Sequence, residues 1–204
     1  MTGMDPHADG VSRAVNAVRG ATAALLTTGE SRAGLAAIAA RIHAAADRLE
    51  VRADTVADRL QQMDKIGRIM RYSPVVGSVN AIAPPLRLQP SESGLEGTVC
   101  FSAAYRGVNA MVHEGAAALV LDVALAEANI HAGAVGVTAQ LTLRFHRPIP
   151  VGCELRVTSR HDSVNGRKIF SSGQLWMGKE LCVSAEGLFV AVPREVPGAP
   201  RRPE

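Results

Sequence analysis

Apolar residues recur at helical spacing through the first third of the chain. Between Val11 and Leu26 they fall three or four positions apart, which predicts an amphipathic helix. A break at 27–31 follows, in which Ser31 is suited to begin a second helix as its N-cap. In that second helix apolar residues fall seven apart, at Ile42, Leu49, Val56, Met63 and Met70. The stripe is narrow, so we expect residues 1–70 to form a helical extension lying on the main domain or on a partner chain.

The pattern changes beyond the segment 73–85, which is interrupted by prolines and has no periodicity. Short strands are predicted at 86–89 and 96–102. A helix from about His113 to Asn129 comes next. It is apolar around almost its whole circumference, which is typical of a buried helix.

Four strands are predicted after this helix. Residues 137–145 alternate between apolar and polar until two prolines end the pattern. Two further strands flank the turn Asn165-Gly166, and the last hairpin turns at 177–179. Strands in antiparallel succession beside one apolar helix predict an α+β fold in which the sheet curls around the helix. We place this domain at 71–192, with a proline-rich, flexible tail at 193–204.

Composition restricts the classes of function. The formal net charge is +3 and aromatic residues make up 3%, which argues against nucleic acid as a partner. No apolar run approaches the ~18 residues of a membrane span, and the N-terminus lacks the order of a signal peptide. The cysteines, at 100, 153 and 182, are too far apart to indicate a metal site or a disulfide framework. We therefore expect a cytoplasmic protein with reduced thiols and no membrane partner.

Asp122 is the only charged residue between Gly115 and Ala126. A lone carboxylate on a buried helix is costly to keep ionised, and burial raises the pKa of a carboxyl towards the range of a general base. We predict that Asp122 is catalytic. The alternative is a structural carboxyl that a neighbouring hydroxyl or backbone group satisfies.

The N-terminus of this helix lies too far from Asp122 of the same chain for the two to act on one substrate. His113 precedes Asp122 by nine residues, which rotates the helix by ~900° and separates the two by ~13 Å along the axis. Gly115 shares a face with Asp122 but lies ~10 Å away. The free N–H groups of a helix N-terminus can polarise a carbonyl, so Asp122 would have to use those of another subunit. This geometry predicts a symmetric dimer with its sites at the interface.

Two motifs in this order give the domain a family resemblance. The first is His113-Glu114-Gly115 followed after six residues by Asp122, and the second is the strand at 137–145 ending in Arg147-Pro148-Ile149-Pro150. Together they resemble the hotdog-fold acyl-CoA thioesterases of the PaaI-like type. The similarity covers about residues 73–191. It implies a hotdog domain assembled as a homodimer, or as a homotetramer of two dimers.

The resemblance also implies roles for individual residues. The reaction would be hydrolysis of an acyl-CoA thioester without a metal or redox cofactor, with Asp122 as general base or nucleophile. Backbone N–H groups near Glu114 and Gly115 of the other subunit would polarise the carbonyl, while His113 holds the helix start. Thr138 matches a position that orients the attacking water. The candidates for contacts to the substrate are Asn109, Arg147, Ser159, Arg160 and Lys168, the last four for the pantetheine and phosphate groups of CoA.

Glu114 departs from the family pattern, in which this position is glycine. A glutamate adds bulk and negative charge where the backbone should approach the thioester, yet it is also a favourable residue at a helix N-terminus. A non-catalytic acyl-CoA or lipid-binding protein on the same fold therefore stays open as an alternative. A hydratase on this fold would need a histidine and an acid within reach, which the spacing of His113 and Asp122 argues against.

Overall fold

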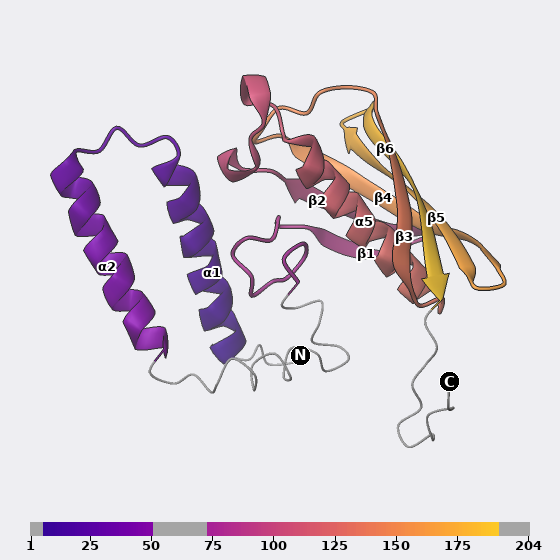
Figure 1. Ribbon diagram of the computed structural model, residues 1–204, viewed down its shortest axis with the longest axis horizontal. Coiled ribbons are helices and arrows are strands. Elements are labelled where there is room, and N and C mark those ends of the chain that lie inside the picture. The colour runs from indigo at the N-terminus through magenta and orange to yellow at the C-terminus, as the bar shows by residue number, and fades with distance from the viewer. Residues whose placement is uncertain (1–5, 51–72, 192–204) are drawn as a thin grey trace, which may run out of the picture. The chain divides into compact units, whose positions relative to one another are not determined.

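The computed structural model describes residues 6–50 and 73–191 (Figure 1). The chain divides between Ala83 and Pro84 into two compact units. No helix in the described part of the chain is long and apolar enough to span a membrane.

The first unit contains two helices, α1 (Pro6–Leu25) and α2 (Arg32–Glu50). The predicted N-cap is confirmed, because the Ser31 hydroxyl accepts a hydrogen bond of 3.0 Å from the Gly34 N–H. Arg19 of α1 donates to the Asn80 carbonyl at 2.8 Å and so ties the helix to the segment after residue 73. In the seven-residue stripe of α2, Ile42 and Leu49 are exposed. The remaining members of that stripe, at 56, 63 and 70, lie outside the described residues.

The second unit is one six-stranded antiparallel sheet with a single long helix, α5 (Glu114–His131). The predicted strands and helix all form, and the turns at 165–166 and 177–179 fall between strands as expected. Two short 3₁₀ helices, η1 (Ala103–Tyr105) and η2 (Val108–Ala110), precede α5. The strands lie in the order β1-β2-β4-β5-β6-β3. Their bounds are β1 Arg87–Ser91, β2 Gly94–Cys100, β3 Gly136–Phe145, β4 Glu154–Asn165, β5 Lys168–Met177 and β6 Glu180–Ala191.

The expected pairing of the four last strands in succession is wrong for β3. It pairs with β6 at the edge of the sheet, while β4 lies between β2 and β5. The connection 146–153 explains the difference, because its backbone bonds to the segment before α5 rather than forming a hairpin. The Val112 N–H donates to the Ile149 carbonyl at 2.7 Å, and the Gly152 N–H donates to the Phe101 carbonyl at 2.8 Å.

Helix α5 runs along one face of the curled sheet, which confirms the predicted hotdog architecture (Figure 1). Two glycines of the sheet allow the close approach: a Cβ at Gly173 would lie 2.8 Å from Leu125 Cδ1, and one at Gly187 would lie 2.7 Å from Leu125 Cδ2. Only one stripe of the helix is buried, so the prediction that it is buried all round is wrong. The buried residues are Ala117, Val120, Leu121, Ala124, Leu125, Ala128 and Asn129.

Candidate active site

Asp122 and Thr138 are brought together from α5 and β3. The Thr138 hydroxyl donates a hydrogen bond of 2.9 Å to Oδ1 of Asp122. A β-bulge interrupts the pairing of β3 between Thr138 and Gln140. A bulge changes the direction of the side chains beside it, and bulges are frequent next to active sites. Asp122 was a candidate from the residue pattern and Thr138 from the family resemblance, and the structure joins the two by a direct contact.

The carboxylate of Asp122 is accessible, in contrast to the burial expected from the apolar sequence around it. Asp122 is half-buried, as is Val123, whereas Leu121 is fully buried. Asp122 thus lies where the buried stripe of α5 gives way to its open side. A carboxylate in this position can meet water or a substrate, which a carboxylate beneath the sheet could not.

The first turn of α5 is capped by the imidazole of His113. Nδ1 of His113 accepts a hydrogen bond of 3.0 Å from the Gly115 N–H. A Cβ at Gly115 would lie 3.2 Å from that nitrogen, so the ring and the glycine fit each other closely. His113 therefore holds the helix start, the role that the family resemblance implied.

This cap changes which N–H group is available to a substrate. The Gly115 N–H, one of the two donors expected to polarise a carbonyl, is already bonded to His113. The Ala116 N–H donates to the His113 carbonyl at 2.9 Å. Within residues 73–191, no acceptor is bonded to the N–H of Glu114, which is exposed. The donor open to a ligand at this helix start is thus the Glu114 N–H.

The loop before α5 holds two consecutive residues in left-handed conformations, Asn109 at φ 51° and Ala110 at φ 58°. Asparagine adopts this region readily, but alanine does so at a cost, which marks local backbone strain. The loop is held by a bond of 2.8 Å from the His113 N–H to the Tyr105 carbonyl. Asn109 is exposed beside the helix start. The strain at Ala110 had no signal in the sequence, because alanine is not a typical left-handed residue.

The candidate CoA contacts do not gather around Asp122 in one chain. Arg147 follows the far end of β3, nine residues or ~30 Å of strand beyond Thr138, and forms an ion pair with Glu180 at 3.5 Å. Lys168 is exposed at the start of β5. Ser159 is only 4% exposed, and no described residue is hydrogen-bonded to its hydroxyl. It therefore cannot reach a phosphate in solvent without a rearrangement.

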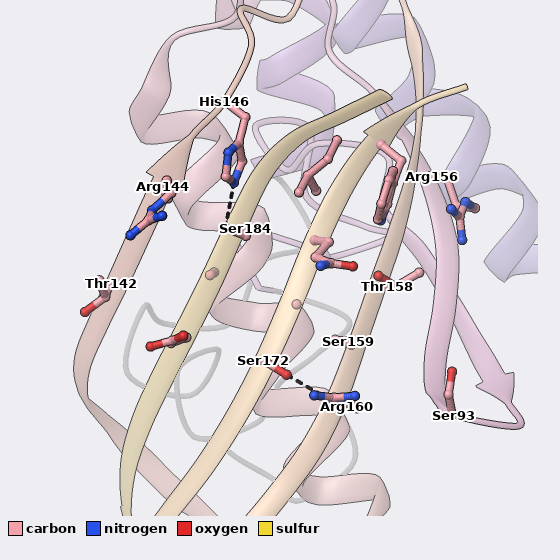
Figure 2. A pocket seen from close by; sticks show the side chains of 16 residues that line it. Ser93, Thr142, Arg144, His146, Arg156, Thr158, Ser159, Arg160, Ser172 and Ser184 are labelled. Atoms are coloured by element: carbon pink, nitrogen blue, oxygen red, sulfur yellow. Dashed lines mark hydrogen bonds between the residues drawn. The ribbon is translucent and has the colours of Figure 1, made fainter. Parts of the chain in front are cut away.

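Arg160 lines a polar groove on the sheet face turned away from α5 (Figure 2). The groove has a volume of 620 Å³. Most of its lining residues belong to β3, β4, β5 and β6, and His146, just after β3, is bonded to Ser184 at 2.9 Å. Nε of Arg160 is bonded to Asp162 at 2.7 Å and to the Ser172 hydroxyl at 3.1 Å.

Two groups of this unit away from Asp122 and the helix start, Glu127 and Cys182, have shifted pKa values. Desolvation by burial raises the pKa of Glu127, which follows Asp122 by five residues on α5. Burial also raises the pKa of the Cys182 thiol, an effect that the backbone hydrogen bond of Met177 opposes. Glu127 was missed because it lies one residue beyond the apolar run that singled out Asp122. Among residues 6–50 and 73–191, no group of three or more His, Cys, Asp or Glu side chains could hold a metal ion.

The helix start, Asp122 and Thr138 all lie within residues 109–183, which match the family model described as Thioesterase superfamily. Residues 3–58 match a second model, described as Hypothetical protein RHA1_ro05818, N-terminal helical domain. The crystal structure of protein RHA08564, a thioesterase superfamily protein, is 41% identical, covers 88% of this chain and 90% of that chain, and has a TM-score of 0.80. This chain belongs to the thioesterase superfamily.

More distant relatives match a smaller part of the chain. Acyl-coenzyme A thioesterase THEM4 of Bos taurus is 36% identical over 92 residues, which are 44% of this chain and 38% of that protein. The chain thus matches less than half the length of this curated relative. The crystal structure of thioesterase superfamily member 2 from zebra fish is 16% identical, with a TM-score of 0.53 over 65% of this chain and 98% of that chain, and shares the fold.

Proposed function

We propose that this superfamily member hydrolyses an acyl-CoA thioester to a free acid and CoA. The observation that carries the proposal is the hydrogen bond from Thr138 to the accessible carboxylate of Asp122. A carboxylate fixed by one donor on Oδ1 keeps Oδ2 and its remaining lone pairs for a water molecule or a substrate carbon. The THEM4 relative is named for its action on acyl-coenzyme A thioesters, which supports this substrate class.

Asp122 can act in either of two ways. As a general base it takes a proton from water while the water oxygen attacks the thioester carbonyl carbon. The tetrahedral oxyanion then collapses, the C–S bond breaks, and the CoA thiolate leaves and is protonated. As a nucleophile, the carboxylate displaces the thiolate to form an anhydride, which water hydrolyses. Thr138 orients Asp122 in both cases.

Carbonyl polarisation in this proposal falls to the Glu114 N–H of a second subunit. Within one chain, eight residues or ~12 Å of helix separate Glu114 from Asp122, too far for one thioester to contact both. Thr138 belongs to β3, an edge strand with a neighbour on one side only, and Asp122 is bonded to it. A homodimer formed along this edge supplies the missing donor. Assembly of two such dimers stays a prediction, as do membership of the PaaI-like group and a cytoplasmic location.

Glu114 also favours a second candidate function. Its carboxylate belongs to the same residue as the available N–H, so it places negative charge near the oxyanion that would form there. If that charge prevents carbonyl activation, the protein binds acyl-CoA without hydrolysing it. In both functions Asn109, Arg147, Arg160 and Lys168 stay predicted contacts to the substrate.

The test measures thiol release from a panel of acyl-CoA thioesters. Asp122→Asn removes the base and the nucleophile while it keeps the shape of the side chain, and we expect kcat to fall by about 10²- to 10⁴-fold. Glu92→Gln, at the exposed turn between β1 and β2, is the matched control and should keep full activity. Absence of thiol release by the wild-type protein together with tight acyl-CoA binding would establish the second candidate instead.

A further inference from the structure

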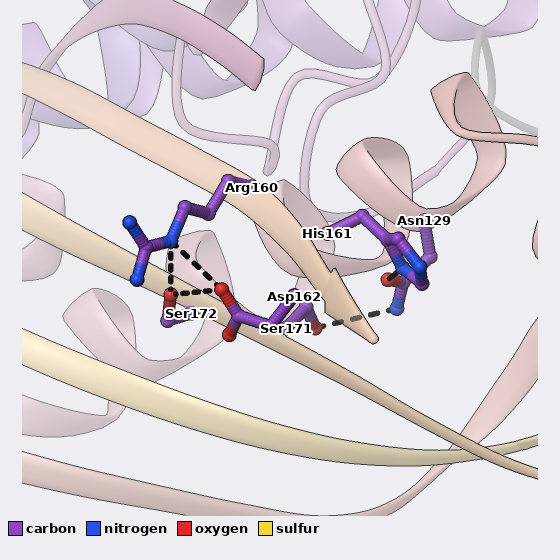
Figure 3. Close-up of polar contacts among 6 residues, drawn as sticks. All are labelled: Asn129, Arg160, His161, Asp162, Ser171 and Ser172. Atoms are coloured by element: carbon purple, nitrogen blue, oxygen red, sulfur yellow. Dashed lines mark hydrogen bonds and ion pairs between the residues drawn. The ribbon is translucent and has the colours of Figure 1, made fainter. Parts of the chain in front are cut away.

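Three polar side chains meet at the C-terminal end of α5, outside the site described above (Figure 3). Asn129 of α5 is 1% exposed and Ser171 of β5 is 2% exposed. Asn129 Nδ2 donates to the Ser171 hydroxyl at 3.3 Å, and Asn129 Oδ1 lies 2.9 Å from Nδ1 of His161. His161 and Ser171 are direct register partners in β4 and β5. The sheet therefore presents both side chains to one helical residue.

These contacts place a hydrogen on Nδ1 of the imidazole. Because Nδ2 of Asn129 faces Ser171, its Oδ1 accepts a hydrogen bond from Nδ1–H of His161. In the neutral ring Nε2 then carries the free lone pair. No residue among 6–50 and 73–191 is hydrogen-bonded to Nε2. The network thus presents one oriented nitrogen without a protein partner.

On the opposite face of the sheet, side-chain hydrogen bonds join β4 and β5 next to His161. A β-bulge lies between His161 and Ser163. Asp162, the bulged residue, accepts from Nε of Arg160 at 2.7 Å and from the Ser172 hydroxyl at 3.1 Å. Figure 3 shows the two polar clusters at this level of β4 and β5. Because both faces are bonded, the backbone that carries His161 cannot easily change direction.

His161 lines a pocket of 490 Å³ at this end of the hotdog unit. It is the only residue with a polar side chain among those that line the described pocket. The others are small or apolar: Ala132, Gly133, Ala134, Val135, Val164, Ile169 and Ala191. Small-molecule sites commonly combine apolar side chains with a few polar groups, and here the one polar side chain in the lining is that of His161.

We propose that this pocket binds an aliphatic carboxylic acid, with the carboxyl group hydrogen-bonded to Nε2 of His161 and the chain against the apolar lining. Histidine suits this head group in both of its states. The neutral ring accepts the O–H of the acid, and the protonated ring donates N–H to the carboxylate, so the same proton lies between the same two atoms. Asn129 and Ser171 are positioning residues, since they act on the ligand through His161.

The pocket is separate from the Asp122 carboxylate. Asn129 follows Asp122 by seven residues, which places it ~10 Å further along α5. The proposal does not depend on thioester hydrolysis, although the acid that hydrolysis would release belongs to the class that this pocket suits. The test is therefore a binding measurement on the full-length protein that needs no turnover.

The probe is sodium octanoate, measured by isothermal titration calorimetry and by the ¹³C-labelled histidine ring signals in NMR. We expect saturable binding that shifts the His161 signals more than those of the other histidines. His161→Phe keeps an aromatic ring but removes both ring nitrogens, including Nε2. It should weaken octanoate binding at least about tenfold. Val164 lines the pocket and is 54% exposed, so a tryptophan there can fill the pocket without disturbing the core. Val164→Trp should abolish octanoate binding. His146→Phe removes a histidine that is bonded to Ser184 outside this pocket, and it should leave octanoate binding unchanged.

Asp122→Asn distinguishes this pocket from the proposed reaction site. Octanoate binding that survives Asp122→Asn and is lost in Val164→Trp supports the proposal even if the protein releases no thiol. Binding that is lost in Asp122→Asn and kept in His161→Phe and Val164→Trp would place the acid at the reaction site and overturn the proposal. Absence of saturable binding at millimolar octanoate would also overturn it.

Discussion

The Thr138 hydroxyl donates a 2.9 Å hydrogen bond to Oδ1 of Asp122 and so joins the central helix to the edge strand of the sheet. A bulge in β3 lies directly beside Thr138. The contact therefore depends both on the packing of α5 and on a local irregularity of the strand. A change in the packing of α5 or in this bulge would therefore redirect the carboxylate even if Asp122 itself is kept.

Replacing Thr138 by valine should lower kcat while the fold is retained. Valine has nearly the shape of threonine but leaves Oδ1 of Asp122 without its donor, and a hydrogen bond to a charged group is worth about 1.5–3 kcal/mol. If that bond is needed in the transition state, kcat falls by about tenfold or more. Thr138→Ser keeps the hydroxyl and should keep most of the rate. Steady-state kinetics on both variants is the measurement, and equal rates for valine and serine would contradict the orienting role.

His113 should contribute to stability as a helix cap. His113→Ala removes the acceptor of the Gly115 N–H, which costs about 1 kcal/mol for a typical N-cap. His113→Asn supplies another side-chain acceptor of the kind that N-caps prefer and should recover most of the loss. Urea unfolding of the two variants checks this. If alanine and asparagine unfold at the same urea concentration, the hydrogen bond to Gly115 does not stabilise the helix.

Glu114 should behave mainly as a helix residue, because the backbone N–H beside it does not depend on the side chain. Glu114→Gln loses a favourable interaction with the helix dipole, worth about 0.3–1 kcal/mol of stability. Turnover should stay within about threefold of wild type, since the N–H that polarises the carbonyl remains. Glu114→Gly tests bulk as well as charge. A tenfold rise in either variant would show that the glutamate limits carbonyl activation, and a tenfold loss would make it a participant.

The sequence predicted the elements of the hotdog unit well, because the helical repeat and the alternation of a strand both depend on residues close together in the chain. The apolar helix, the alternating β3 and the Asn165-Gly166 turn each depend on neighbours in the chain. The pairing of β3 with β6 was not predictable in this way. It depends on where the connection 146–153 finds its backbone partners, which are residues distant in the sequence.

The candidate site was predicted in part for a similar reason. The residue types and spacing made Asp122 and the helix start candidates, and the family resemblance added Thr138. They did not show that the open side of α5 leaves Asp122 half-buried, nor that His113 uses the Gly115 N–H. Burial depends on which face of a helix lacks a neighbour, and the cap depends on one side-chain rotamer. Asn129 had one unused signal: it is a polar residue seven positions after Asp122 on a largely apolar helix.

Gly173 should be required for the approach of α5 to the sheet. A Cβ there would lie 2.8 Å from Leu125 Cδ1 and 2.9 Å from the Thr158 carbonyl oxygen. The side chain could move, but the backbone oxygen belongs to a central strand, so Gly173→Ala should destabilise the protein by about 1–3 kcal/mol. Gly20→Ala is the matched control, since nothing lies within 4 Å of its Cβ and alanine favours a helix. Thermal unfolding of both variants is the measurement, and an unchanged melting temperature for Gly173→Ala would contradict the close packing.

Glu127 should make stability fall as the pH rises. Burial raises the pKa of this carboxyl in the folded state above its ordinary value of 4.5. The folded protein then binds more protons than the unfolded chain, so this contribution to stability is fully present below pH 4.5 and is lost as the pH rises through the folded pKa. Glu127→Gln removes the charge, and at pH 7 it should stabilise the protein by less than about 1 kcal/mol, because solvent screens a half-buried group. Denaturant unfolding of both proteins across pH 4–8 tests this. The advantage of the glutamine should shrink towards pH 4, and an advantage that is constant across the range would show that the effect is not one of charge.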